Sequence, residues 1–489
     1  MHNIEKAFIQ IYACLIIGLF LWYSVNIIRF PFGADYGEAP LMDQVRRIEN
    51  GDTLYKSSIN EPPYIIANYP PLYPYWIAAT NLILKIPLFQ AGRITSLIFS
   101  LLSGYIIGLF IHRLTDNKLY GVFSAVIFWG HPYVMFWSSL ARVDLMALAF
   151  SLLGLWILFR YKDSRLGIVL ACFCFLVSAF TRQTYLLSGP LAGFVWLWHL
   201  YRKRALIFIS SFAIIGLLLF GMINAITNGG FYMNIVVANI NIYALPQALA
   251  KGKQLFTIWP IILVISAIIL FLTIYTRYKK PSDHQGQIFQ QDFLFYGLVF
   301  YTLGALITAG TVGKVGSNVN YFLELIAVCS VWCGLALKLI INQKNKVRIF
   351  ILGLLFLQTV FVLGNSFILC QLTTQDLWGK LVSYENLNEK VQAAVREGVV
   401  LSDDFMDLVV LSGQPIYYQP FEYGELFYAD LWEPTELVNQ INKREFPLII
   451  IGGNTLDKNC CWVPSMVNAL EMNYQINAVN DVLLLTPLK

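Results

Sequence analysis

The sequence predicts an α-helical membrane protein that crosses the bilayer about eleven times and ends in a small α/β domain. Of its 489 residues, 57% are hydrophobic and only 13% are charged, which is far from the balance of soluble proteins. Apolar runs of bilayer length recur from residue 8 to residue 369. From residue 371 onward charge returns and the apolar runs become short. These observations predict a polytopic protein with a soluble C-terminal region.

The predicted spans are apolar runs long enough to approach the roughly 20 residues that a bilayer requires. They lie near residues 8–28, 93–111, 119–138, 144–160, 166–181, 184–200, 205–223, 257–276, 293–311, 321–341 and 347–369.

Basic residues concentrate in every second connection between these spans, for example at 113–118, 160–165, 202–204 and 338–348. The positive-inside rule therefore places the N-terminus in the cytoplasm of a plasma (inner) membrane protein. The long first loop, about residues 29–92, and the C-terminus then lie outside. The net charge of +5 is explained by these loops, so we expect no nucleic-acid partner.

This topology requires residues 73–86 to form an interfacial helix rather than a crossing. Their short length and their Tyr and Trp content favour a helix that lies in the interface. A kinked short span is the alternative, and it would invert every later loop.

We expect two domains, a transmembrane catalytic domain at 1–370 and an extracytoplasmic α/β domain at 371–489. In the second domain, four apolar runs are typical of short strands, and three periodic stretches are typical of helices. The runs are 399–401, 408–411, 448–451 and 482–485, and the helical stretches are 384–397, 434–444 and 464–472.

The most informative segment is 32–38, which directly follows the first span and contains Asp35 and Glu38. Ionisable residues at the edge of a membrane segment usually have a function. The alternative is that both are solvated loop acids or a helix cap. If the segment is helical, their spacing of three puts both carboxylates on one face, and if it is extended they diverge.

The long loop continues with Gly51-Asp52-Thr53-Leu54-Tyr55 and then Asn68-Tyr69-Pro70-Pro71-Leu72-Tyr73. Together with Asp35-Tyr36-Gly37-Glu38, this resembles the first extracytoplasmic loop of the GT-C glycosyltransferases. The similarity is greatest to the family-39-like group of polyprenyl-phosphate-sugar-dependent mannosyltransferases and the aminoarabinose transferase of lipid A. Segments 140–144 and 180–183 extend the resemblance over most of the membrane region. The chain departs from the pattern in one respect: many members carry two adjacent acidic residues, whereas Asp35 and Glu38 are three residues apart.

The resemblance implies an integral membrane glycosyltransferase that transfers a sugar from a polyprenyl-phosphate donor, with inversion, on the extracytoplasmic face. The acceptor would be a hydroxyl on a glycan, lipid or protein. Asp35 would be the general base, which must reach the acceptor proton and remain ionised. Glu38 would orient the acceptor or the base.

The leaving phosphate needs cationic partners on the outer side, and Arg142, Arg182 and Lys314 are the candidates. The two arginines could instead be interface anchors. Asp144 would orient the acceptor or the base, or it could only cap a helix.

Residues 313–324 lack the spacing of a Walker phosphate loop, since Thr308 stands where a glycine is needed. Asn320, Tyr321 and Glu324 are predicted to line the sugar pocket, although a buried pairing is the alternative for Glu324. Tyr69 could stack on a sugar ring or belong to the aromatic belt.

The sequence contains no Asp-x-Asp pair, which favours a lipid monophosphate over a nucleotide donor. No residue is assigned to a metal, and it stays open whether a divalent cation assists. A transporter or flippase of lipid-linked sugars is the alternative function, but such proteins place ionisable residues near the bilayer midplane. A scaffold or sensor, in which Asp35 would be dispensable, is a third hypothesis.

Overall fold

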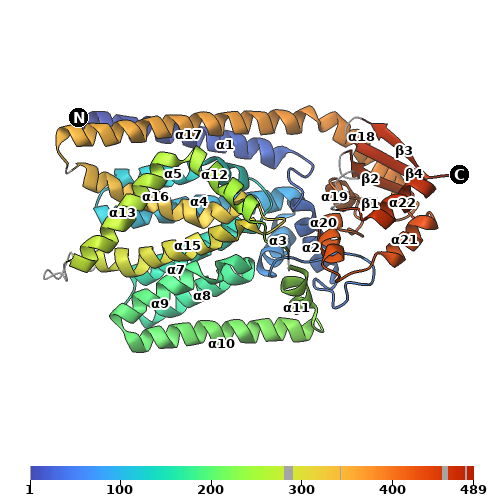
Figure 1. Cartoon of the computed structure of the whole chain (residues 1–489), viewed down its shortest axis with the longest axis horizontal. Helices are drawn as coiled ribbons and strands as arrows, with labels where there is room; N and C mark the ends of the chain where they lie inside the picture. The colour runs from blue at the N-terminus through green and yellow to red at the C-terminus, as the bar shows by residue number, and fades with distance from the viewer. Residues whose placement is uncertain (1, 240, 280–289, 342, 454–460, 480–481) are drawn as a thin grey trace.

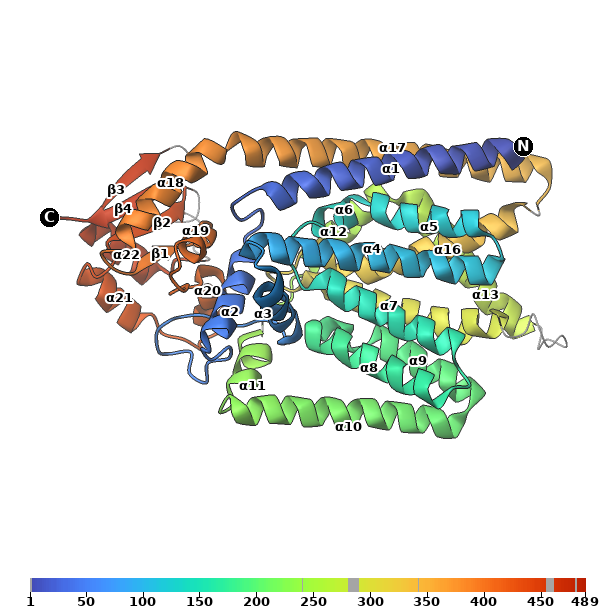
Figure 2. The same cartoon turned by 180° about the vertical axis from the view of Figure 1, so that it is seen from behind.

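The chain forms a bundle of long helices with a mixed α/β domain at one end (Figure 1). The computed structural model describes residues 2–239, 241–279, 290–341, 343–453, 461–479 and 482–489. The N-terminus lies at one end of the long axis and the C-terminus at the other (Figures 1 and 2). The first loop and the C-terminal domain share the same end of the bundle.

Each of the eleven predicted spans overlaps at least one helix of this bundle, and the run at 119–138 overlaps two. The helices are α1 (His2–Arg29), α4 (Leu88–Thr115), α5 (Lys118–Gly130), α6 (Pro132–Trp137), α7 (Asp144–Arg160), α8 (Arg165–Thr181), α9 (Ser188–Leu200), α10 (Arg202–Ile226), α13 (Pro260–Lys279), α15 (Phe300–Gly310), α16 (Leu323–Ile341) and α17 (Asn345–Gly379).

Seven helices within the described ranges are long and apolar enough to cross a membrane, so the protein is a multi-pass membrane protein. They are Lys6–Arg29, Leu88–Thr115, Arg202–Ile226, Pro260–Tyr278, Gln290–Gly313, Val319–Ile340 and Lys346–Gly379. The other four predicted spans contain the shorter helices α5, α7, α8 and α9. The run at 119–138 is interrupted because Pro132 opens a new helix, α6, which the His131 side chain caps by accepting from the Tyr133 N–H.

Four short helices cover the end of the bundle near the C-terminal domain: α2 (Glu38–Asn50), α3 (Leu72–Leu84), α11 (Gly230–Ile235) and α12 (Leu245–Ile258). α2 ends at Gly51, whose φ of 79° is readily adopted only by glycine. α3 corresponds to the predicted interfacial helix and packs on α2 and α4. Its last residues, Leu82, Ile83 and Leu84, are largely exposed.

The C-terminal domain is built on a four-stranded sheet in the order β1-β2-β4-β3, in which β1 and β2 are parallel and the other pairs antiparallel. Its elements are α18 (Leu381–Ala394), β1 (Val400–Ser402), α19 (Met406–Leu411), α20 (Pro420–Tyr428), α21 (Thr435–Asn442), β2 (Leu448–Gly452), α22 (Pro464–Asn473), β3 (Tyr474–Val479) and β4 (Val482–Pro487).

The prediction of a strand at 408–411 was wrong, because this run is the buried helix α19. A four-residue apolar run has no diagnostic period, and here it packs between β1 and α2 rather than pairing with a strand. Strand β3 was missed, since its apolar residues alternate with Gln475 and Asn477 and form no continuous run like those of the predicted strands.

The first loop and the C-terminal domain are joined by backbone pairing. The Tyr64 N–H donates to the Tyr417 carbonyl at 2.6 Å, and the Gln419 N–H donates to the Tyr64 carbonyl at 2.9 Å. Ile59, Tyr64 and Ile66 complete the hydrophobic core of the domain. In addition, α17 runs without a break through residue 370, the predicted end of the membrane domain. The domain therefore sits directly over the loop.

A substitution of Gln419 tests the contact between the first loop and the C-terminal domain. The Gln419 side chain is 1% exposed and its Oε1 accepts the Ile66 N–H at 2.7 Å. We expect Gln419→Leu to destabilise the protein by about 1–3 kcal/mol, because a buried N–H loses its partner. Thermal unfolding in detergent, with the exposed Gln475→Leu as a control, measures this. Equal melting temperatures for the two variants would contradict the role of this contact.

Candidate active site

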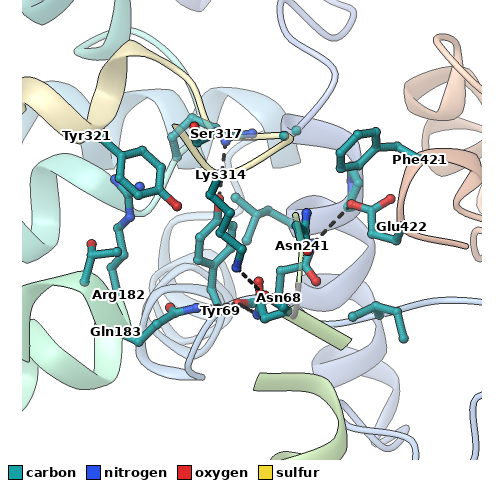
Figure 3. Close-up of a pocket in the computed structure, with 18 of the residues that line it drawn as sticks. Asn68, Tyr69, Arg182, Gln183, Asn241, Lys314, Ser317, Tyr321, Phe421 and Glu422 are labelled. Atoms are coloured by element: carbon teal, nitrogen blue, oxygen red, sulfur yellow. Dashed lines mark hydrogen bonds between the residues drawn. The ribbon is translucent and has the colours of Figure 1, made fainter. Parts of the chain in front are cut away.

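A cavity of about 420 Å³ lies where the bundle, the first loop and the C-terminal domain meet (Figure 3). Five of the predicted site residues line it together: Tyr69, Arg142, Arg182, Lys314 and Tyr321. They come from the first loop, the start of α7, the end of α8 and the connection between α15 and α16. Sequence positions far apart are thus brought to one site of the size expected for a small ligand.

Asp35 does not line this cavity itself, although the next two residues, Tyr36 and Gly37, do. It lies in a turn closed by the hydrogen bond from the Glu38 N–H to the Asp35 carbonyl. Its carboxylate pairs with Arg142 at 3.1 Å and also accepts the Gly37 N–H. A Cβ atom at Gly37 would overlap the Arg142 guanidinium, so a glycine is needed for this approach. The Asp35 side chain remains 21% exposed and faces a smaller neighbouring cavity, which Tyr36 lines as well.

Glu38 points away from Asp35 and is fully buried. One oxygen accepts from Arg93 Nε and the Ala141 N–H, and the other accepts from Arg93 Nη2 and the Ala34 N–H. The two carboxylates therefore diverge, and all Glu38 contacts are internal. The Arg93 guanidinium also donates to the carbonyls of Ile27, Phe30 and Phe32.

Asp144, the first residue of α7, forms a buried ion pair with Arg182 and accepts from Asn320 at 3.0 Å. It makes no capping hydrogen bond, since Val143 holds the N-cap position. The Arg182 guanidinium stacks over the Tyr321 ring at 4.6 Å. Asp144, which Asn320 holds by a hydrogen bond, thus fixes Arg182 in the cavity wall.

Lys314 differs from both arginines. Its ammonium donates to the Asn239 carbonyl, and burial lowers its pKa. Among the described residues that line the cavity, Lys314 is the cation that contacts no carboxylate. Its charge is available to an anionic ligand.

The opposite side of the cavity belongs to the C-terminal domain, where Phe421 and Glu422 begin α20 (Figure 3). Glu422 accepts from the Tyr36 hydroxyl at 3.2 Å and from Asn68 Nδ2 at 3.1 Å. Burial raises the pKa of this carboxyl to about 7. Glu422 is not predicted from the sequence, since no local pattern marks it and only folding brings it to the loop.

Several buried polar atoms of the cavity wall have no hydrogen-bond partner within the described structure. They are Gln44 Oε1, Gln183 Oε1, Thr184 Oγ1 and the Nε atoms of Arg142 and Arg182. Buried polar groups are normally paired, so the wall is suited to a ligand rich in hydroxyl and phosphate groups.

Glu324 lies outside the set of lining residues. It is buried between helices of the bundle, where it accepts from the hydroxyls of Ser151, Ser188 and Tyr301. These partners tie α7, α9 and α15 to α16. In the described part of the chain, no group of three or more His, Cys, Asp or Glu side chains could hold a metal ion.

Comparisons with known proteins identify the fold. No family model matches the chain, and no curated protein matches it by sequence. The structure of ArnT from Cupriavidus metallidurans in the apo state superposes with a TM-score of 0.63 and 12% identity, over 98% of each chain. The chain has the fold of the GT-C membrane glycosyltransferases.

Two further structures share this GT-C fold. ArnT bound to undecaprenyl phosphate matches with a TM-score of 0.61 and 11% identity, over 98% of each chain. The apo oligosaccharyltransferase of Archaeoglobus fulgidus matches at 0.57 and 11%, over 94% of this chain and 73% of that one. The resemblance that the loop motifs predicted is therefore confirmed at the level of the fold, and the match to ArnT includes the C-terminal domain.

The buried Arg93–Glu38 pair can be tested by removing one partner. Arg93→Met leaves a carboxylate and three carbonyl groups without their donor, and we expect a loss of about 3–5 kcal/mol. Arg113→Met, an exposed site on the same helix α4, should change stability by less than about 0.5 kcal/mol. Thermal unfolding in detergent distinguishes the two, and an Arg93→Met protein as stable as the control would contradict the assignment.

Proposed function

We propose that the protein is an integral membrane glycosyltransferase that moves a sugar from a polyprenyl-phosphate donor to an acceptor hydroxyl on the extracytoplasmic face. The observation that carries this proposal is Lys314, a cation without a carboxylate partner that lines the same cavity as Arg182. A phosphate diester would supply the missing charge. The fold supports a lipid-linked donor, because structures with this fold contain undecaprenyl phosphate or dolichol-phosphate.

The proposed reaction is a direct displacement with inversion. The acceptor oxygen bonds to the anomeric carbon while the bond from that carbon to the phosphate oxygen breaks. Asp35 takes the acceptor proton, and the electron pair leaves with the phosphate, whose charge Lys314 and Arg182 stabilise. Arg142 holds the Asp35 carboxylate in place.

The remaining predicted residues are assigned by their contacts. Glu38 holds the turn that carries Asp35, and Asp144 with Asn320 holds Arg182. Tyr69 and Tyr321 face the cavity and are suited to pack against a sugar ring. Glu324 fixes the helices beneath the site.

For the topology we propose eleven crossings, with the N-terminus in the cytoplasm. The first loop and the domain at 371–489 would then lie on the outer side, where lipid-linked sugars are used. The cavity lies at one end of the bundle beneath the C-terminal domain, which is unlike the midplane site of a transporter.

Lys314→Met tests the donor site. Loss of one charge-assisted contact should weaken binding of a polyprenyl phosphate by about 10- to 100-fold. Lys253→Met, an exposed residue of α12, serves as the matched control and should bind as the wild type does. Binding is measured with radiolabelled polyprenyl phosphate and protein in lipid nanodiscs. Equal affinities for the two variants would place the phosphate elsewhere.

Asp35→Asn tests the base, because it preserves shape but cannot accept the proton. We expect transfer from a panel of radiolabelled polyprenyl-phosphate sugars to fall by about 10²- to 10⁴-fold, with donor affinity nearly unchanged. Label that instead crosses the bilayer in proteoliposomes, equally with both proteins and without a new bond, would establish a flippase.

A further inference from the structure

The two sides of the cavity differ in charge. Figure 3 shows Arg182 and Tyr321 on one side, Phe421 and Glu422 on the other, and Asn241 and Asn68 between Lys314 and Glu422. Among the described lining residues, Glu422 is the one carboxylate. The cavity is therefore cationic where the bundle contributes residues and anionic where the C-terminal domain does.

In an inverting displacement, this difference in charge between the two sides indicates where each substrate binds. The acceptor oxygen must attack the anomeric carbon from the face opposite the leaving phosphate. If the phosphate binds at Lys314 and Arg182, the acceptor approaches from the side of Glu422. Glu422 also contacts Tyr36, the residue that directly follows Asp35, so it lies next to the loop that carries the proposed base.

Glu422 is held in position for such a contact. Its carboxylate accepts two hydrogen bonds, from Tyr36 and Asn68, and an ionised carboxylate has about four acceptor sites. Lone pairs therefore remain for a ligand. The unpartnered Oε1 of Gln44, which is 2% exposed and lines the same cavity, is a second acceptor atom. Both atoms call for a ligand that donates hydrogen bonds.

We propose that Glu422, presented by the C-terminal domain, binds the acceptor substrate, and that this acceptor presents neutral sugar hydroxyls to it. The inference rests on the proposed function. A glycan supplies hydroxyl donors for Glu422 and Gln44, and an apolar ring face for Phe421. A phosphate or carboxylate next to the reacting hydroxyl would be repelled by Glu422 and would leave Gln44 unpaired. The domain thus selects the acceptor, while the bundle binds the donor.

The same contact predicts a pH dependence. Burial raises the pKa of Glu422 to about 7, so the ionised form that accepts hydroxyl donors becomes populated as the pH rises through that value. The groups that face it are Tyr36 from the first loop, Tyr418 and Tyr423 from its own domain, and Arg142 from the bundle. We expect the KM for the acceptor to fall between pH 6 and pH 8.

The experiment compares Glu422→Gln with Glu425→Gln, a second partly buried glutamate of α20 that does not line the cavity. Transfer from a polyprenyl-phosphate sugar to a neutral oligosaccharide is measured against acceptor concentration and pH. In Glu422→Gln the acceptor KM should rise about 10- to 100-fold and lose its pH dependence. Donor affinity, measured separately with polyprenyl phosphate, should stay within about twofold of the wild type.

Glu422→Asp covers the case in which the amide variant does not fold. It retains the charge one methylene further away, so it should raise the KM but keep the pH dependence. A Glu422→Gln protein that matches Glu425→Gln in KM and pH profile overturns the inference and leaves the transferase intact. Preferred transfer to a phosphorylated oligosaccharide overturns the acceptor class. A wild type that binds polyprenyl phosphate but transfers to no acceptor overturns the proposed function itself.

Discussion

The buried pair between Arg93 and Glu38 holds the geometry on which the rest of the site depends. Arg93 donates hydrogen bonds to three carbonyl groups at the C-terminal end of α1, and Glu38 accepts hydrogen bonds from the N–H groups of Ala34 and Ala141. One ion pair thus connects the ends of α1, α2 and α4 with the segment that precedes α7. Because Asp35 lies on this turn and Arg142 follows Ala141, the position of the Asp35–Arg142 pair is set by a contact that never faces the cavity.

The distribution of charge around the cavity follows from this arrangement. Arg142 forms an ion pair with Asp35, and Arg182 forms one with Asp144. The charges of both arginines are therefore largely neutralised within the protein. The Lys314 ammonium donates a hydrogen bond to a backbone carbonyl, and the Glu422 carboxylate accepts hydrogen bonds from neutral side chains. Lys314 and Glu422, which is negative when ionised, lie on opposite sides of the same cavity. Such a site is suited to an anionic group on the Lys314 side and a hydrogen-bond donor on the Glu422 side.

The sequence predicted the helices and three cations that line the cavity, because both depend on local signals. Apolar runs mark the helices, and Arg142, Arg182 and Lys314 stand out as cations in connections that carry few basic residues. The sequence did not predict Arg93 or Glu422. Arg93 lies near the start of an apolar helix, and no sequence motif distinguishes it. Glu422 reaches the cavity only through the backbone pairing of Tyr64 with Tyr417 and Gln419. The error at 408–411 has a similar cause, since burial from several sides hides the period of a short run.

The most direct test of the central claim is an experimental structure of the protein in a lipid nanodisc with a polyprenyl phosphate bound. We expect phosphate density within hydrogen-bond distance of Lys314 Nζ, with the lysine released from the Asn239 carbonyl and Arg182 still paired with Asp144. Phosphate density outside this cavity, with Lys314 unchanged on the carbonyl, would contradict the claim.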